Sequence, residues 1–422
     1  MTTVGPARPA RVARAGQPRG AAAPAGAPTR QGPAALSYYL VGGATLLLLA
    51  IGVVMVLSAS SITSIQENDG NPYGYFLSQA QFAMLGLPLM ALASRVPVAW
   101  YRRLAWPALI GALLLQALIF TPLARGTQGN TNWIMIPGLG QTIQPSEFLK
   151  LALALWLGLI MARKAHLLHR WQHVMVPGLV VSGLAVLLVL GGRDLGTALV
   201  VVAVVAGALF VAGVPLRWFG AAAVLAAGAA AFLVVGSQNR MQRVTAVFGA
   251  DCDATAACYQ TLHGLYGLGT GGISGVGLGA SREKWAYLPE AHNDFIFAIL
   301  GEELGLLGTL LVLALYAALA TGMFRIVRRH PDPFVKVATG GIAAWILGQA
   351  LINIGVVIGF IPVIGVPLPL VSAGGSALIA TMLAMGVVLA FARDEPGAGA
   401  ALRARRGTVR RSLAVVGRHG RA

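Results

Sequence analysis

The chain has 422 residues, of which 57% are hydrophobic and only 11% are charged, and it carries a formal net charge of +17. A charged fraction far below the roughly 25% of soluble domains, with a mean hydropathy of +0.74, excludes a soluble globular protein and indicates an integral membrane protein. The positive charge alone would fit a nucleic-acid-binding protein, but the basic residues follow the predicted membrane topology and no nucleic-acid-binding motif accompanies them.

The two ends of the chain are polar and basic. Residues 1–36 are rich in Pro, Ala, Gly and Arg and have no hydrophobic periodicity, so we expect a disordered basic tail. No cleavable signal peptide precedes the first apolar run, which is therefore expected to remain as a membrane anchor. Residues 394–422 form a second basic tail.

Between the tails, apolar runs recur at about 20 residues, the length that crosses about 30 Å of hydrocarbon as a helix. We predict an all-α integral membrane domain over residues 37–393 with ten transmembrane helices. The eighth span is long enough to tilt or to begin above the membrane surface. The expected spans are 37–58, 75–94, 104–122, 145–162, 175–191, 195–213, 217–236, 294–324, 337–358 and 373–392.

The distribution of Lys and Arg predicts the orientation of these spans. With the N-terminus in the cytoplasm, 24 of the 31 basic residues fall on the cytoplasmic side and six on the outer side. Both termini are therefore expected in the cytoplasm, where the basic tails meet anionic membrane lipid. Residues 236–292 then form a large outer loop between spans seven and eight.

The outer loop contains three local features. Its glycine-rich stretch GLYGLGTGGISGVGLG, residues 264–279, fits either a flexible re-entrant loop or a backbone site for phosphate. Cys252 and Cys258 fit either a local disulfide on the outer side or two free thiols. Arg240 and Arg243, against the positive-inside trend, fit either a bidentate phosphate contact or a solvated charge pair.

Carboxylates at membrane depth are functional candidates by default, because an acid in or beside a bilayer is costly. Asp294 lies where the outer loop enters the eighth span, a position that suits a general base. Glu302 and Glu303 lie about 12 Å deeper along a helix. We expect them to be structural intramembrane charges, with Lys150 as their candidate partner.

A further cluster begins the fourth span. Pro145 and Ser146 form a helix start, and Glu147 and Lys150, at i and i+3, share one face and fit a local ion pair. Trp133 fits an interfacial aromatic. Prolines and glycines between residues 353 and 377 break the helix after the ninth span, and irregular backbone at that depth lines a cavity or is buried in protein.

Four segments in sequence order resemble the motifs of the SEDS (shape, elongation, division and sporulation) proteins, the family of FtsW, RodA and SpoVE. They are QPSEFLK, DLGTALV, GVGLGASREKWAYLPEAHNDFIFAILGEELG and NIGVVIGFIPVIGVPLPLVSAGGS. The resemblance covers all ten predicted spans. PEAHNDFIFA and the basic tails are more similar to the division branch, in particular to its actinobacterial members, than to the elongation branch.

The resemblance implies a peptidoglycan glycosyltransferase that polymerises lipid II into β-1,4 glycan strands at the outer face of the cytoplasmic membrane, for the division septum. Implied partners are a class B penicillin-binding protein transpeptidase and other proteins of the division machinery. Asp294 matches the essential aspartate of the family. The implied substrate-binding residues are Trp133, Glu147, Lys150, Arg240, Arg243, Arg282, Lys284, His292 and Ser372.

Three segments depart from the family pattern. Residues 130–132 read Asn-Thr-Asn where a basic residue is common, Gly192 and Arg193 stand where Gln-Pro is common, and Ala373 replaces an aromatic residue in SAGGS. None of these changes touches the aspartate.

Several alternatives stay open from the sequence. The chain also fits a lipid II flippase or transporter, a RodA-type elongation polymerase, or a non-catalytic scaffold. A transporter needs ionisable groups near the midplane, whereas Asp294 and the basic candidates gather on the outer side, which favours the enzyme. The spacing of the outer carboxylates is not that of a recognisable metal site, and a divalent cation, Mg²⁺ or Mn²⁺, is left open.

Overall fold

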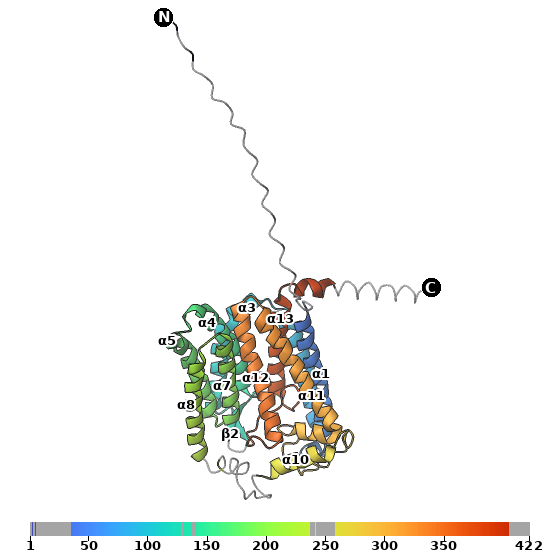
Figure 1. The fold of residues 1–422 in the computed structure, drawn as a ribbon. Coiled ribbons are helices and arrows are strands. Elements are labelled where there is room, and N and C mark those ends of the chain that lie inside the picture. The colour runs from blue at the N-terminus through green and yellow to red at the C-terminus, as the bar shows by residue number, and fades with distance from the viewer. Residues whose placement is uncertain are drawn as a thin grey trace, which may run out of the picture. The chain divides into compact units, whose positions relative to one another are not determined.

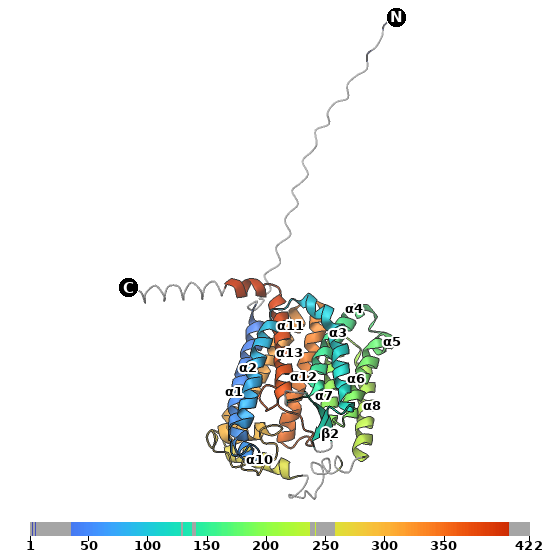
Figure 2. The same ribbon diagram turned by 180° about the vertical axis from the view of Figure 1, so that it is seen from behind.

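The computed structural model describes residues 35–127, 130–136, 141–236 and 258–404, together with the isolated residues Thr2, Gly5 and Met241. Long helices run side by side in one bundle, and the views in Figures 1 and 2 both place strand β2 and helix α10 at the same end of it. We call this the outer end, because the predicted topology puts both segments outside the cell.

The bundle confirms the prediction of a helical, multi-span membrane protein. Within the described ranges, eight segments are long and apolar enough to cross a membrane, and α7 and the Leu216–Ala229 part of α8 are shorter apolar helices. The helices are α1 (Leu36–Glu67), α2 (Gly74–Ala93), α3 (Val98–Ala117), α4 (Pro145–Arg163), α5 (Trp171–Val174), α6 (Val180–Gly191), α7 (Leu195–Val211), α8 (Leu216–Val235), α10 (Tyr259–Gly271), α11 (Ile296–Arg329), α12 (Pro333–Val357) and α13 (Gly375–Asp394), with short helical turns at Leu118–Phe120, Ala165–Leu167 and Met175–Leu179.

Helices α4 and α13 form the centre of the bundle. The membrane-length window of α4 is 89% buried and that of α13 is 78% buried, against 28% for α2 and α3. Helix α4 packs on α3, α7, α12 and α13. Polar side chains carried by α4 are therefore shielded from both lipid and water, which decides the role of Glu147 and Lys150 below.

Three helix starts follow from local sequence. Pro145 occupies the first turn of α4, where its missing N–H costs nothing. Asp194 and Asp332 cap α7 and α12, accepting hydrogen bonds from the backbone N–H of Thr197 and Phe334 respectively. Such caps satisfy amide groups that a helix leaves unpaired at its start.

The prediction of an all-α fold misses a small antiparallel sheet on the outer side, between α3 and α4. Its strands, in the order β1-β2-β3, are β1 (Ala124–Thr127), β2 (Asn130–Met135) and β3 (Thr142–Ile143). The backbone N–H of Thr131 donates to the carbonyl of Gly192 at 3.0 Å, so the sheet is tied to the turn between α6 and α7. This sheet carries Trp133.

Helix α11 is broken at Gly305, whose φ of 66° lies in the left-handed region that glycine tolerates. Residues 272–277 pair with the break. The amides of Val276 and Gly277 donate to the carbonyls of Glu302 and Glu303 at 2.9 and 3.0 Å, and Leu306 N–H donates to Gly272 O at 2.9 Å. Of the two alternatives for residues 264–279, a flexible loop does not describe this stretch, which begins within α10 and continues with backbone hydrogen bonds to α11.

Candidate active site at the outer end of the bundle

Asp294 lies in the turn that leads into α11, at the outer end of the bundle, and is half-buried. Three successive carbonyls fix its backbone. Ala373 N–H donates to His292 O at 3.0 Å, the Ser372 hydroxyl donates to Asn293 O at 2.7 Å, and Asn353 Nδ2 donates to Asp294 O at 2.7 Å. The aspartate is thus held by the end of α12 and by the segment that precedes α13.

That segment, residues 358–374, is the irregular backbone expected from its prolines and glycines. Asn353 Nδ2 also donates to Val366 O at 2.8 Å, and the Ser372 hydroxyl accepts from Leu368 N–H at 2.7 Å, so two side chains satisfy freed backbone groups. Gly365, with φ of 68°, lies against the aspartate: a Cβ there would sit 3.5 Å from Asp294 Oδ2. Ser372 therefore shapes the site through the backbone.

A pocket of about 230 Å³ opens beside this turn. It is lined by side chains of α2, of the small sheet, of the turn before α11 and of the segment before α13: Tyr75, Ser78, Gln79, Phe82, Trp133, Gln141, Thr142, His292, Asn293, Ala373, Gly374 and Gly375. Trp133, His292 and Asp294 are separate candidates in the sequence. The structure brings Trp133 and His292 into one wall and places Asp294 next to it along the chain.

His292 is a titratable side chain of the pocket wall, beside Tyr75. It is 9% exposed, its ring packs on Tyr75 at 4.7 Å between centroids, and its Nδ1 has no hydrogen-bond partner within the described part of the chain. Burial lowers the pKa of His292 below its ordinary 6.5, against the opposing effect of the Glu290 and Glu67 carboxylates. A neutral imidazole is thus available to a polar ligand in the pocket.

Glu147 and Lys150 form the predicted ion pair inside the bundle. Lys150 Nζ lies 2.8 Å from Glu147 Oε1, donates to Gln349 Oε1 at 3.0 Å and stands 4.7 Å above the ring of Trp345. The two charged residues are only 2% and 1% exposed. A ligand in the outer pocket would have to displace packed helices to reach them, so they act on the site through the position of α4.

Asp194 is a buried carboxylate that sequence analysis left out of the site. Its oxygens accept from Thr197 N–H and hydroxyl at 2.8 and 2.7 Å, from Asn132 Nδ2 at 2.9 Å and from Gln144 Nε2 at 3.3 Å. It therefore joins the sheet, the start of α4 and the start of α7. The sequence feature that could have identified Asp194 is its position immediately before a helix. One of its hydrogen-bond donors is Asn132, which lies in a segment that departs from the family pattern.

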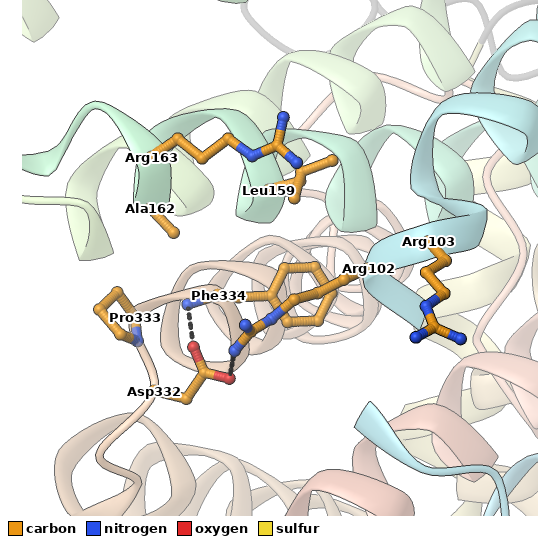
Figure 3. Close-up of a pocket in the computed structure, with 8 residues that line it drawn as sticks. All are labelled: Arg102, Arg103, Leu159, Ala162, Arg163, Asp332, Pro333 and Phe334. Atoms are coloured by element: carbon orange, nitrogen blue, oxygen red, sulfur yellow. Dashed lines mark hydrogen bonds and ion pairs between the residues drawn. The ribbon is translucent and has the colours of Figure 1, made fainter. Parts of the chain in front are cut away.

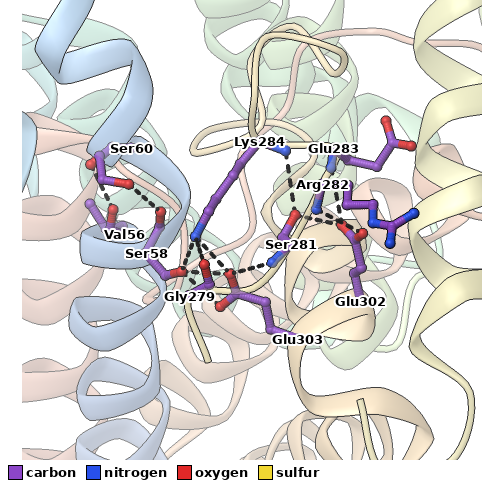
Figure 4. A network of polar contacts seen from close by, with 11 residues as sticks. Val56, Ser58, Ser60, Gly279, Ser281, Arg282, Glu283, Lys284, Glu302 and Glu303 are labelled. Carbon is purple, nitrogen blue, oxygen red and sulfur yellow. Dashed lines mark hydrogen bonds and ion pairs between the residues drawn. The ribbon is translucent and has the colours of Figure 1, made fainter. Parts of the chain in front are cut away.

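Glu302 and Glu303 bond to residues of the outer loop and of α1, so the expectation of Lys150 as their partner is wrong. Figure 4 shows Glu303 facing Lys284 and Ser58: Lys284 Nζ lies 3.2 Å from Glu303 Oε1, and the Ser58 hydroxyl donates to it at 2.6 Å. Lys150 is already engaged within α4 and α12, and the loop brings in a lysine 19 residues away in sequence.

Glu302 is satisfied by neutral donors from the same loop. Its carboxylate accepts from the Ser281 hydroxyl at 2.5 Å and from the amides of Arg282 and Glu283 at 3.0 and 3.4 Å. With Glu303 it forms a network, defined here as Ser58, Ser281, Lys284, Glu302 and Glu303, that fastens the outer loop to α1 and α11 (Figure 4).

This network changes the expected role of Lys284, one of the implied substrate-binding residues. Lys284 is 5% exposed and also donates to Gly279 O at 2.7 Å, so its ammonium is saturated by protein groups. Arg282 is exposed and remains accessible to an anion. The sequence signal for both was only a basic residue in the outer loop, which does not distinguish them.

Residues 39–396 match the family of FtsW, RodA and SpoVE, described as cell cycle proteins. The chain belongs to this family. The match covers every described bundle helix from α2 to α13 and most of α1, which confirms the SEDS resemblance seen in the motifs.

Relatives of this SEDS chain carry a functional name. This chain is 36% identical over 371 residues to "Probable peptidoglycan glycosyltransferase FtsW" of Mycobacterium tuberculosis, and the match covers 88% of this chain and 70% of the relative. It is 40% identical over 351 residues to the protein of the same name from Halorhodospira halophila, covering 80% of this chain and 86% of the relative.

Solved structures show the same fold. A chain of a peptidoglycan synthase complex, studied for the structural coordination of polymerization and crosslinking, has a TM-score of 0.68 at 28% identity and covers 84% of this chain and 97% of its own. The rod shape determining protein RodA of Thermus thermophilus has a TM-score of 0.62 at 27% identity, with coverage of 85% and 97%.

Some predicted features of this SEDS chain lie outside the described residues. They are Arg240, Arg243 and Cys252. Cys258 is 2% exposed and disulfide-bonded. Within the described ranges, no three His, Cys, Asp or Glu side chains are grouped to hold a metal ion.

Proposed function

We propose that this chain is a peptidoglycan glycosyltransferase of the FtsW type, which polymerises lipid II at the outer face of the cytoplasmic membrane during septum formation. The family, and relatives named peptidoglycan glycosyltransferase FtsW at 36–40% identity, support this activity. The observation that carries the proposal for the site is the fixed position of Asp294 beside an outer pocket.

The topology that goes with this function has ten spans, with α7 and α8 as the sixth and seventh and both termini in the cytoplasm. The segment from residue 236 to 292 is then the outer loop. The excess of Lys and Arg on one side supports this orientation. Strand β2 and helix α10 lie at the end of the bundle that this topology places outside (Figure 1).

In the proposed reaction, the carboxylate of Asp294 takes the proton of the 4-hydroxyl of the acceptor GlcNAc. The hydroxyl oxygen attacks C1 of the donor MurNAc, the bond from C1 to the pyrophosphate oxygen breaks, and undecaprenyl pyrophosphate leaves with inversion at C1. A fixed base contributes by being held where the proton departs. The three carbonyl contacts at residues 292–294 supply that fixation.

The other polar groups divide by accessibility. Trp133 and His292 line the pocket and would contact a sugar, because an aromatic face and a neutral imidazole suit its apolar faces and hydroxyls. Arg282, with Arg240 and Arg243, would stabilise the departing pyrophosphate, whose charge requires cations. A divalent cation remains an additional source of that charge.

Two further assignments belong to this proposal. A class B penicillin-binding protein would cross-link the strands, and other division proteins would recruit the pair. The similarity to a chain from a complex that couples polymerization and crosslinking supports such a partner. Transport of lipid II is the less favoured alternative, because Glu147 and Lys150, two buried charges within α4, bond to each other.

The test is polymerisation of lipid II by the purified full-length chain, with and without a class B penicillin-binding protein. Asp294→Asn should lower the rate by about 10²–10⁴-fold, the usual contribution of a general base. Asp69→Asn is the matched control: it makes the same change at an exposed outer residue with φ of 50°, a conformation that Asn accepts. Polymer at the wild-type rate from folded Asp294→Asn protein would reject the base.

A further inference from the structure

A second concave site lies at the opposite end of the bundle from Asp294. Figure 3 shows it between the start of α3, the end of α4 and the start of α12, and its volume is about 360 Å³. Helix α4 separates the two ends: it starts next to the outer pocket at Gln144 and ends at Arg163, 19 residues or about 28 Å further along its axis.

Three guanidinium groups and one carboxylate line this site. Arg102 pairs with Asp332 and stands 5.4 Å above the ring of Phe334. The other oxygen of Asp332 caps α12, so both of its oxygens are used. The lining therefore carries a net charge of +2 from Arg103 and Arg163.

These two arginines are free to bind an anion. Both are exposed, and within the described ranges neither forms an ion pair with a carboxylate of the chain. The guanidinium carbon of Arg103 lies 5.7 Å from the centroid of the Trp100 ring, a contact that leaves its positive charge unneutralised. Guanidinium groups bind phosphate oxygens through two parallel N–H donors, and a pair around one cavity is suited to a phosphate.

The position of the cavity identifies the source of the phosphate. Its arginines mark the ends of two membrane helices, which is the depth of lipid headgroups on the cytoplasmic side. Trp100 and Leu104 of α3, beside the arginines, are 51% and 48% exposed and belong to the face that lipid covers. A headgroup in the cavity would leave its acyl chains along that apolar face.

We propose that Arg103 and Arg163, with Arg102 and Phe334 as the wall, form a binding site for the phosphate of an anionic phospholipid in the cytoplasmic leaflet. A lipid with a net negative headgroup matches the net charge of +2. A zwitterionic lipid brings its own ammonium group, and Asp332 has no free oxygen to receive it. The site is independent of the proposed polymerisation chemistry at the outer end.

The test uses the full-length chain, purified and stripped of lipid, and native mass spectrometry to follow bound lipid. The probes are phosphatidylglycerol and phosphatidylcholine with identical acyl chains, and inorganic phosphate as competitor. The variant Arg103→Gln/Arg163→Gln is compared with Arg170→Gln/Arg217→Gln, which removes the same charge from other exposed residues of the same face.

The unchanged protein should bind phosphatidylglycerol in preference to phosphatidylcholine. The affinity for phosphatidylglycerol should fall about tenfold in Arg103→Gln/Arg163→Gln and less than about twofold in Arg170→Gln/Arg217→Gln, because only the first variant loses two charge-assisted contacts. If inorganic phosphate does not displace the lipid, the lipid is the ligand. If inorganic phosphate displaces the lipid at equal concentration, the site binds free phosphate.

Two results would overturn the proposal. Equal losses in the two double variants would mean that binding reflects only the charge of the cytoplasmic face. Equal retention of phosphatidylcholine and phosphatidylglycerol by the unchanged protein would exclude an anionic ligand.

Discussion

Replacing Lys284 by Met tests the interior network that fastens the outer loop. Its ammonium contacts Glu303 Oε1, the carbonyl of Gly279 and the hydroxyl of Ser58 at 3.2, 2.7 and 3.2 Å. In Lys284→Met the carboxylate of Glu303 would keep only the Ser58 hydroxyl and a 3.4 Å contact to the Ser281 amide. One negative charge would then be buried without a cation.

The magnitude follows from burial. The side chains of Lys284 and Glu303 are 5% and 0% exposed, and at 3.2 Å the attraction is about 5 kcal/mol for an effective dielectric constant of 20. Because desolvation of the lysine is relieved in the variant, we expect a net loss of about 3–5 kcal/mol in the free energy of unfolding, as when one partner of a buried pair is removed.

A second substitution separates two roles for Lys284. If the residue is structural, adding Glu303→Gln to Lys284→Met should restore about 2 kcal/mol, because the unbalanced charge disappears and contacting residues couple by 0.5–3 kcal/mol. Polymerisation should recover with stability. If Lys284 instead binds the pyrophosphate, Glu303→Gln cannot rescue activity.

The assays are denaturant unfolding in detergent, lipid II polymerisation, and hydrogen exchange of residues 272–284. The amides of Val276 and Gly277 bond to the carbonyls of Glu302 and Glu303, so they should exchange faster in Lys284→Met and return toward normal in the double variant. Additive stability losses, or fast exchange in neither variant, would refute the structural role.

Three further predictions concern Ser372, the pair Gly275 and Gly277, and His292. Ser372→Ala removes hydrogen bonds to two backbone groups and should lower the free energy of unfolding by about 1–3 kcal/mol. It should also slow polymerisation and leave the KM for lipid II little changed. Normal kinetics in this variant would contradict the role of Ser372 in positioning Asp294. Gly275→Ala should destabilise the chain strongly, because its Cβ would lie 2.1 Å from Glu303 O, whereas Gly277→Ala, also at positive φ but in open space, should lose only about 1 kcal/mol; thermal unfolding compares the two. The pKa of His292 in the folded chain lies below 6.5, so the unfolded chain takes up the proton first as the pH falls. The contribution of His292 to the free energy of unfolding is therefore complete above pH 6.5 and is lost as the pH falls through and below that value. His292→Phe should flatten the dependence of the unfolding free energy on pH across that range, and an unchanged slope would exclude the His292 imidazole as the cause of this pH dependence.

Features with a local sequence signal could be predicted. The apolar runs located the membrane helices, because a span needs about 20 consecutive apolar residues. The spacing of Glu147 and Lys150 located an ion pair within α4, because residues at i and i+3 on a helix are neighbours. Asp294 was found at the outer end because its place at the boundary of an apolar run is visible in one dimension.

Features that depend on contacts between distant residues were missed. Glu303 meets Ser58, 245 residues away, and no periodicity links them. The sheet was missed because its strands of four, six and two residues are too short to show alternation. The sequence around Gly305 has the apolar composition of a continuous helix, so it does not indicate a break. The helix breaks there because residues 272–277 form hydrogen bonds with its backbone.

The interruption at Gly305 also solves a problem of length. An unbroken helix of 34 residues would measure about 51 Å, against about 30 Å of hydrocarbon. The part that follows Gly305 measures about 36 Å, which a moderate inclination accommodates. The first nine residues of α11, which include Glu302 and Glu303, then need not lie within the hydrocarbon. The bilayer need not thicken around them, and their carboxylates receive hydrogen bonds from protein groups instead of water.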